Sequence, residues 1–261
     1  MSQITTHAPG TFSWVELGTT NADAAKKFYA SLFGWEPKDT PTGDAGTYTL
    51  LMLGGREVGG LSNMQKEQLT QGVPPHWLPY IAVASADETT KKAETLGAMV
   101  LAGPFDVMEH GRMSVIQDPT GAAFAIWQAK SHPGAGVRDE PGSISWCELL
   151  TNDAAKAGKF YTGLFGWSLQ EMPMPGMKYT VFTRGTSQVG GMMTIMKEWG
   201  PMPSNWLTYF AVADCNGTAD KAKKLGGTIM KAPDDIPGVG RFAILGDPQG
   251  GTFAILQSAK A

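Results

Sequence analysis

GTFSWVELGTTNADAAKKFYASLFGW, residues 10–35, returns at residues 142–167 as GSISWCELLTNDAAKAGKFYTGLFGW. Without a gap, 15 of the 26 aligned positions are identical, at a constant offset of 132 residues. Later segments recur in the same order: VGG (58–60 and 189–191), WLPYIAV and WLTYFAV (77–83 and 206–212), DPTGAAFAIWQ and DPQGGTFAILQ (118–128 and 247–257). Self-similarity at a fixed spacing indicates a repeated structural unit. The chain is therefore predicted to be one domain present twice.

The length agrees with this duplication. A chain of 261 residues suits two domains of about 130 residues, each large enough for its own core. Residues 131–141, SHPGAGVRDEP, are rich in Gly, Pro and charge, which is typical of a linker. The predicted domains are residues 1–130 and 142–261, joined by that linker.

The composition is that of an ordinary soluble protein. Hydrophobic residues make up 42% of the chain and charged residues 17%, and the net charge is −3 with a pI of about 5.8. These values argue against nucleic acid or a membrane as a partner, and no apolar stretch approaches the length of a membrane span. The start of the chain lacks the pattern of a secretory signal, and the two cysteines occupy different places in the repeat, so we expect free thiols in the cytoplasm.

Strand and helix signals alternate within each half. Apolar and polar residues alternate over residues 11–17, which is typical of a strand. The apolar residues that follow have helical spacing, and this predicted helix can be capped by Asn21 and ended by Gly34. Short strand-like runs come next, at 48–53 and 57–64. A strand at 77–84 then leads to a helix that opens at Ser85, and strands follow at 98–101, 113–117 and 123–128. Each half is thus predicted to hold two units of a strand, a helix and further strands, in the α+β class.

Two glutamates are the most unusual feature of the predicted strands. Period-two geometry places Glu16 on the same face as Trp14, and Glu148 is its counterpart in the repeat. A carboxylate in mid-strand is costly unless it is hydrogen-bonded, paired or wet. It could orient a ligand or act as a general base with a raised pKa. The alternative, which we favour, is an internal structural bridge to Arg112 and Arg241.

Aromatic and thioether side chains are abundant around these positions. Tyr80 and Tyr209 could donate a phenolic proton to a ligand, so the candidate catalytic residues are these two tyrosines and the two glutamates. The other candidate ligand-binding residues are Trp14, Trp146, Trp77, Trp206, Met113, Arg112 and Arg241. Fourteen Met and eight Trp suit an apolar or aromatic ligand, although they equally suit a plain core.

A helix that ends in Phe-Tyr…Leu-Phe-Gly-Trp and a closing strand after Asp-Pro-x-Gly resemble the glyoxalase/bleomycin-resistance/dioxygenase superfamily, also called vicinal oxygen chelate. The likeness covers nearly the whole chain and is closest to the two-domain group that includes a mycobacterial culture-filtrate antigen and hydroxylase-like proteins. It implies four βαβββ modules, two in each glyoxalase-like domain, with mixed sheets curled around a cavity. A fold supports many chemistries, so the site needs its own argument.

Metal-dependent members of that family carry ligands on the first and last strands of a module. The matching positions here are Trp14, Gly60, Leu78 and Ala125 in the first half and Trp146, Gly191, Leu207 and Ala254 in the second. Divalent ions need imidazole, carboxylate or thiolate donors, and none of these residues provides one. The resemblance therefore implies no metal at the usual site and no other cofactor, while a divalent ion elsewhere in the chain stays open.

A displaced metal site would require two histidines and a carboxylate around one ion. His76, His110 and Glu16 could supply them only if the loop at His110 folds inward. His7 in the N-terminal tail and His132 in the linker are expected to face solvent. We favour a solvated loop at His110 over a displaced triad.

Two functions of different classes remain. The first is a metal-free protein that binds a small, largely apolar or aromatic molecule, as in the bleomycin-resistance branch. The second is an enzyme, namely a lyase, isomerase, hydroxylase or dioxygenase, that uses Glu16 or Glu148 or a displaced metal. We favour the binder because the usual ligand positions lack donors, whereas an interaction protein would have no sizeable pocket. The fused halves can pair with each other, so a monomer or a homodimer is expected.

Overall fold

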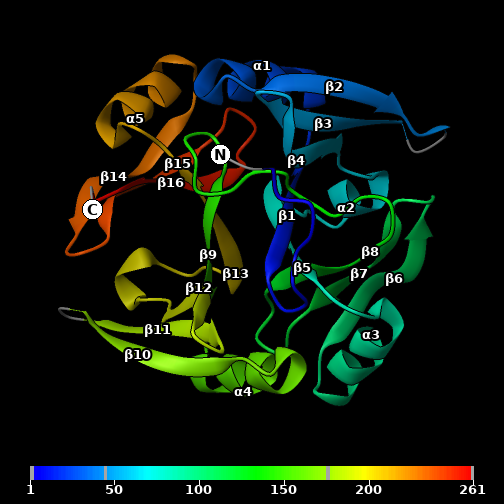
Figure 1. Ribbon diagram of the computed structural model, residues 1–261. Coiled ribbons are helices and arrows are strands. Elements are labelled where there is room, and N and C mark those ends of the chain that lie inside the picture. The colour runs from blue at the N-terminus through cyan, green and yellow to red at the C-terminus, as the bar shows by residue number, and fades with distance from the viewer. Residues whose placement is uncertain (1–2, 44–45, 175–176, 260–261) are drawn as a thin grey trace.

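The computed structural model describes residues 3–43, 46–174 and 177–259, and its two halves have the same order of elements (Figure 1). The first half contains β1 (Phe12–Thr19), α1 (Ala22–Phe33), β2 (Glu36–Pro41), β3 (Thr47–Leu53), β4 (Arg56–Asn63), α2 (Lys66–Thr70), β5 (His76–Ala82), α3 (Ala86–Thr95), β6 (Met99–Val107), β7 (Gly111–Gln117) and β8 (Ala123–Ala129). The second half contains β9 (Ile144–Thr151), α4 (Ala154–Phe165), β10 (Ser168–Met174), β11 (Met177–Arg184), β12 (Ser187–Thr194), a 3-10 turn (Lys197–Trp199), β13 (Asn205–Ala211), α5 (Cys215–Lys224), β14 (Thr228–Ile236), β15 (Gly240–Gly246) and β16 (Thr252–Ser258).

The first helix of each half begins and ends at the residues that the sequence indicates. The Asn21 side chain accepts a hydrogen bond from the amide of Ala24 and caps α1. Gly34 ends the helix with φ +75°, a left-handed conformation that glycine adopts without a steric penalty. In the second half, Asp153 and Gly166 do the same for α4.

Each half forms one curled sheet of mixed direction. The strand order is β2-β3-β4-β1-β5-β8-β7-β6 in the first half and β10-β11-β12-β9-β13-β16-β15-β14 in the second. β1 runs parallel to β4 and antiparallel to β5. A single pair, Thr252 with His76, joins the two sheets into one of 16 strands. This arrangement confirms the predicted α+β class and the tandem modules.

The sequence predicted neither β2 nor β10. Every residue of β2 is exposed, and so are all but one of the residues of β10. Each is an edge strand with one hydrogen-bonded neighbour. An edge strand that buries no side chain lacks the alternation by which a strand is recognised.

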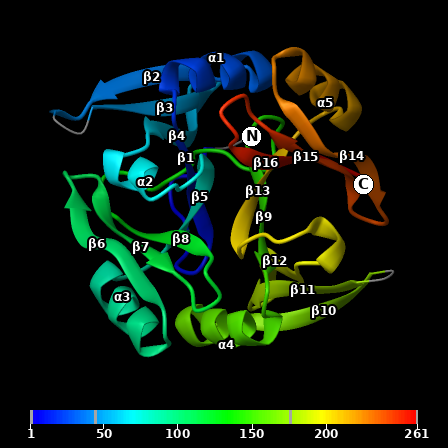
Figure 2. The same cartoon turned by 180° about the vertical axis from the view of Figure 1, so that it is seen from behind.

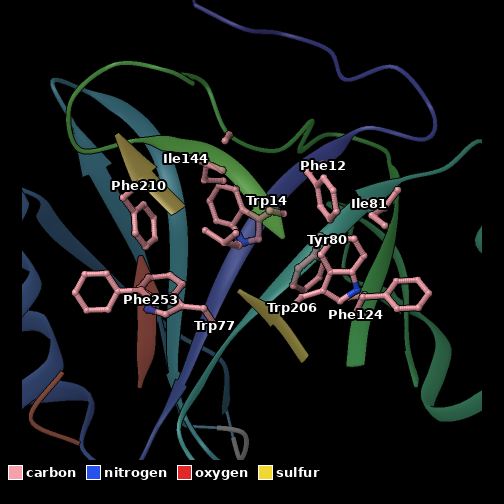
Figure 3. Packing of buried hydrophobic residues seen from close by; sticks show 14 of the residues in the cluster. Phe12, Trp14, Trp77, Tyr80, Ile81, Phe124, Ile144, Trp206, Phe210 and Phe253 are labelled. Atoms are coloured by element: carbon pink, nitrogen blue, oxygen red, sulfur yellow. The ribbon is translucent and has the colours of Figure 1, made fainter. Parts of the chain in front are cut away.

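The four longer helices lie outside the sheets and pair across the two halves. Figures 1 and 2 show α1 beside α5 and α3 beside α4 from opposite sides, and both pairs are in contact. The core between the halves is aromatic: Trp77 packs against Phe210 at 5.0 Å between ring centroids, and Phe12 packs against Trp206 at 5.1 Å (Figure 3). The two sheets therefore share one buried core.

Buried hydrogen bonds also cross between the halves. Tyr29 of α1 donates to Asp247 Oδ2 at 2.9 Å and accepts from the indole of Trp77 at 3.0 Å. In the same way, Tyr161 of α4 donates to Asp118 Oδ2 at 2.9 Å and accepts from the indole of Trp206 at 2.8 Å. A buried polar group that loses its partner costs about 1–3 kcal/mol, so each half depends on a phenol from the other.

The segment between the halves packs onto the first half. The amide of Ala135 donates to the carbonyl of Ser13 at 2.7 Å, and Arg56 forms a bidentate pair with Glu140. Ala135 and Val137 are almost fully buried. This part of the chain is thus a fixed part of the core.

Two global expectations concern cysteines and membranes. Cys147 and Cys215 are both free and buried, as predicted. Within the described ranges, none of the helices combines the length and apolarity needed to cross a membrane.

Candidate functional site

A glutamate linked to two tyrosines lies at the centre of the first sheet. Trp14 and Glu16 on β1 face the same way as their β5 partners Tyr80 and Leu78. We call this side of each sheet the glutamate face, and the opposite side, against which the helices pack, the helix face. Tyr80 and Tyr48 donate to Glu16 Oε2 at 3.1 and 3.0 Å, and the indole of Trp14 donates to the Tyr48 oxygen at 3.1 Å.

Glycine makes room for the Tyr48 phenol. Gly60 lies directly opposite Glu16 on β4. A Cβ at Gly60 would stand 1.9 Å from the Tyr48 oxygen, far inside van der Waals contact. Any side chain at position 60 would therefore displace the phenol from the carboxyl group.

The second half reproduces this network. Tyr209 donates to Glu148 Oε1 at 2.9 Å, and the indole of Trp146 donates to the Tyr179 oxygen at 2.9 Å. The Tyr179 phenol lies near Glu148 and helps to lower the pKa of its carboxyl group. A Cβ at Gly191 would lie 2.0 Å from the Tyr179 oxygen. Four side chains and one glycine thus keep the same roles in both halves.

The surroundings keep these groups protonated to higher pH than usual. Desolvation raises the pKa of Glu16 and of Glu148, and the tyrosine hydrogen bonds oppose that rise. Burial, followed by the nearby Glu16 carboxylate, raises the pKa of Tyr48 and Tyr80 well above the ordinary value. The phenols therefore stay donors, and each carboxyl group is the site where a proton can be held or released.

Sequence reasoning missed Tyr48 and Tyr179, although a signal for them exists. Both tyrosines are followed by threonine. Both also lie eleven residues before the first glycine of the VGG triplet, Gly59 in the first half and Gly190 in the second. The match is weak because the β3 and β11 segments share few other residues. Only the register of these strands against β4 and β12 brings the phenols to the carboxyl groups.

Some of the predicted ligand-binding residues lie elsewhere. Trp77 and Trp206 lie on the helix face, where they bond to the helix tyrosines and pack in the shared core. Met113 lies on the glutamate face opposite Trp127. Trp14 and Trp146 are thus the two predicted tryptophans that join the glutamate networks.

The favoured bridge from the glutamates to the arginines is wrong. Arg112 pairs with Asp87 and Asp106, and Arg241 pairs with Asp235. Asp87 lies at the start of α3, whereas Asp106 and Asp235 lie on the neighbouring strands β6 and β14. The arginines point away from the glutamate face because adjacent residues of a strand point to opposite sides. Tyrosines fill the role that the sequence assigned to arginine.

The expectation of solvent-facing histidines in the tail and the linker is also wrong. His132 Nε2 lies 2.7 Å from Glu57 Oε2, and its ring meets the ring of Trp14 edge-on at 4.9 Å. His7 bonds to the carbonyl of Ala135 at 2.9 Å. Both are partly buried because the linker folds back onto the first sheet.

The donor set does not fit a divalent ion at the family's usual position. Trp14, Gly60, Leu78 and Ala125 surround Glu16 as strand partners or neighbours, and the Tyr48 phenol occupies the space beside Gly60. One carboxylate with no imidazole or thiolate is a poor site for a transition metal.

The displaced triad is not assembled either. His76 Nδ1 bonds to the carbonyl of Pro74, and His110 bonds to the Ser131 hydroxyl. Among the described residues, no three His, Cys, Asp or Glu side chains gather closely enough to hold an ion.

Comparison with known proteins agrees with this architecture. Residues 11–126 and 143–255 each match the profile of the Glyoxalase/Bleomycin resistance protein/Dioxygenase superfamily. The chain belongs to this superfamily. Among curated relatives, "Putative glyoxylase CFP32" of Mycobacterium tuberculosis is 42% identical, with 99% of both chains aligned. "Anthracycline biosynthesis protein DnrV" of Streptomyces peucetius is 34% identical over 97% of this chain and 95% of that one.

Solved structures of superfamily members share the fold. A Mn(II)-bound glyoxalase from Novosphingobium aromaticivorans aligns with a TM-score of 0.67 at 19% identity, over 97% of this chain and 83% of that one. The 2,3-dioxygenase LapB from Pseudomonas sp. KL28 aligns with a TM-score of 0.67 at 13% identity, over 97% and 94%. At this identity the likeness establishes the fold alone.

Proposed function

We propose that this superfamily member binds a small, largely apolar or aromatic molecule on a glutamate face, without a metal ion. The observation that carries the proposal is the replacement of the usual metal ligands by twin Glu–Tyr–Tyr–Trp networks. In each network the carboxyl group offers a polar anchor inside an apolar surface. A site of this kind, mostly apolar with a few placed polar groups, is typical of small-molecule pockets.

The side chains around the second network support an apolar ligand. The glutamate face of the second half carries one continuous cluster, whose buried members are Leu150, Met193, Leu207, Tyr209 and Ala254. Trp146 and Tyr179 pack against it. Methionine and aromatic rings adapt to flat, apolar molecules.

A ligand screen by thermal shift tests this proposal. The panel contains planar aromatic compounds, among them an anthracycline because of the name of one relative, and each hit is measured by titration calorimetry. We expect hits whose affinity is unchanged by exhaustive dialysis against a chelator. Loss of binding after dialysis, restored by a divalent ion, would contradict a metal-free site.

A second candidate is an acid–base enzyme, a lyase or an isomerase. It is favoured by the raised pKa of Glu16 and Glu148, because a carboxyl group that holds its proton to higher pH than usual can pass it to a substrate oxygen or carbon. The two tyrosines would then stabilise the carboxylate that remains. The relative named as a glyoxylase agrees with this alternative.

Glutamine substitution separates the two candidates. Glu16→Gln and Glu148→Gln keep a hydrogen-bond acceptor for the tyrosines but cannot transfer a proton. If the chain is a binder, a ligand found in the screen keeps its affinity within a few-fold, and wild type converts none of it. If it is an enzyme, wild type converts the ligand, and one variant binds it without turnover.

A further inference from the structure

An open pocket of about 620 Å³ lies beside the second glutamate face. Its lining residues are Asn152, Ile195, Met196, Lys197, Gly200, Pro201, Met202 and Pro203. They come from the end of β9 and from the segment between β12 and β13. The volume falls within the range of small-molecule sites.

The pocket is continuous with the side chains around Glu148. Ile195 and Met202 line the pocket and also pack against the cluster that contains Tyr209. Glu148 and Asn152 are four residues apart in sequence, which corresponds to about 13 Å along an extended strand. A molecule in the pocket therefore lies at one end of the glutamate face, beside the buried apolar cluster that surrounds Glu148.

The first half is built differently at the equivalent place. Glu67 and Val73 of the first half match Glu198 and Met202 of the second. Five residues, 68–72, separate the first two, whereas three residues, 199–201, separate the second two. The longer segment is part of the helix α2, whereas the shorter one is part of a 3-10 turn followed by Gly200 at φ +77°. The pocket is formed by this shortened turn.

The two glutamate faces also carry different side chains. Trp127 lies against Gly111, where a Cβ would stand 2.3 Å from the indole, and its N–H donates to the carbonyl of His132 at 2.9 Å. The repeat has Leu256 in place of Trp127 and Gln188 in place of Glu57, the partner of His132. Trp127 and His132 thus cover part of the first face. In the second half, Leu150, Met193 and Phe242 stand where the first has Gly18, Ser62 and Met113.

The charge on the pocket lining is positive. Lys197 is the one cation among its eight described lining residues, and none of the eight is acidic. The Asn152 amide nitrogen is engaged with the Met202 carbonyl at 3.3 Å and the Ser204 hydroxyl at 3.5 Å. The remaining walls are isoleucine, methionine, proline and glycine.

From these observations we propose that the second half is the ligand-binding half and that it takes an apolar or aromatic molecule carrying one anionic group. The apolar part rests on Ile195, Met196 and Met202, and the anion faces the Lys197 ammonium. This inference rests on the proposed function and adds to it the half that binds and the class of ligand.

Two probes with the same rings test the class of ligand. Anilinonaphthalene sulfonate is an aromatic anion, and phenylnaphthylamine lacks the sulfonate; both are followed by fluorescence titration of the full chain. We expect Lys197→Gln to weaken binding of the sulfonate about fivefold and to leave the neutral amine within twofold, because one partly exposed charge pair is lost.

Matched variants test which half binds. Met202→Trp fills the pocket and is expected to weaken both probes more than about tenfold. Lys66→Gln and Val73→Trp make the same changes at the equivalent positions of the first half and should alter neither affinity. Circular dichroism and the thermal midpoint confirm that each variant is folded.

The outcomes separate this inference from the proposed function. If the first-half variants weaken the probes while the second-half variants do not, or if Lys197→Gln weakens both probes equally, the inference is wrong and the proposed function stands. If wild type binds neither probe but binds other members of the apolar panel, the inference again fails alone. If wild type binds none of these molecules, both fail.

Discussion

The glutamate networks of the two halves are alike, but their surroundings differ. Glu16 accepts hydrogen bonds from Tyr48 and Tyr80, and Glu148 accepts one from Tyr209, with Tyr179 close by. In each network an indole donates to the phenol from the third strand, Tyr48 or Tyr179. Around Glu16 the chain adds Trp127 and the returning linker, whereas the second half has Leu256 and an open pocket nearby. The duplication has thus kept the carboxyl–phenol chemistry and varied the side chains around it.

Replacement of Trp127 by the residue of the second half is expected to have the largest effect. Trp127→Leu removes a ring that is 7% exposed, together with its hydrogen bond to His132. Loss of that packing should lower the free energy of unfolding by about 2–4 kcal/mol, as measured by urea denaturation. A midpoint equal to that of wild type would show that Trp127 does not fill the first glutamate face.

The reverse change at the equivalent position is the control. Leu256→Trp enlarges a side chain on the second glutamate face and should cost about 1–3 kcal/mol because of overpacking. If both substitutions cost the same, the two faces would be equally filled, against the difference described above.

The buried phenols between the halves should be next in effect. Tyr29→Phe leaves Asp247 and the Trp77 indole each without one hydrogen-bond partner, and Tyr161→Phe does the same to Asp118 and Trp206. Each variant should lose about 1–3 kcal/mol of unfolding free energy in urea.

Because each phenol bonds across the halves, the whole chain should still unfold in one transition. Phe33→Leu, which alters packing but no hydrogen bond, is the control. Two separate transitions in the tyrosine variants would contradict the shared core.

The comparison also indicates which features can be read from the sequence. The repeat and the caps at Asn21 and Gly34 are local signals, and they predicted the fold and the first helix. Tyr80 and Glu16 were predicted separately as candidate catalytic residues, and the pairing of β1 with β5 brings them together. The Tyr48 phenol was missed because it comes from a third strand, through a gap left by Gly60.

Two errors have the same physical origin. Arg112 and Met113 are adjacent on β7 and cannot both face one ligand, yet both were assigned to it. His132 was judged by the Gly/Pro-rich composition of its segment, although the register of the linker against β1 and β4 buries part of its ring. Long-range register is not encoded in composition.

The pH dependence of stability should differ between the two glutamates. Burial raises both pKa values, so the folded state binds more protons than the unfolded one, and stability falls as the pH rises from about 4.5 through the folded-state pKa. Glu148→Gln and Glu16→Gln should remove this fall. Urea denaturation at several pH values measures it.

The fall in stability with pH should be larger for Glu148, which is 7% exposed, than for Glu16, which is partly exposed. A wild-type curve that is flat over this range would mean that the carboxyl groups ionise as freely as in the unfolded chain. Equal losses in both variants at every pH would point to the hydrogen bonds rather than to ionisation.

The smallest expected effect concerns the pair that only the first half has. The hydrogen bond with His132 lowers the pKa of Glu57 from its ordinary value of 4.5. The pair therefore stabilises the folded state at pH values above 4.5, and this stabilisation is lost as the pH falls through the folded-state pKa. Glu57→Gln, which copies Gln188, should cost about 0.5 kcal/mol at neutral pH and nothing in acid, because both side chains are partly exposed. Gln188→Glu is the control. It should not raise the stability, because the described part of the second half has no histidine to pair with it: Val239 replaces His110, and no histidine stands after β16 in the place of His132. If Glu57→Gln costs as much in acid as at neutral pH, the contact contributes by the packing of His132 against Trp14 rather than by charge.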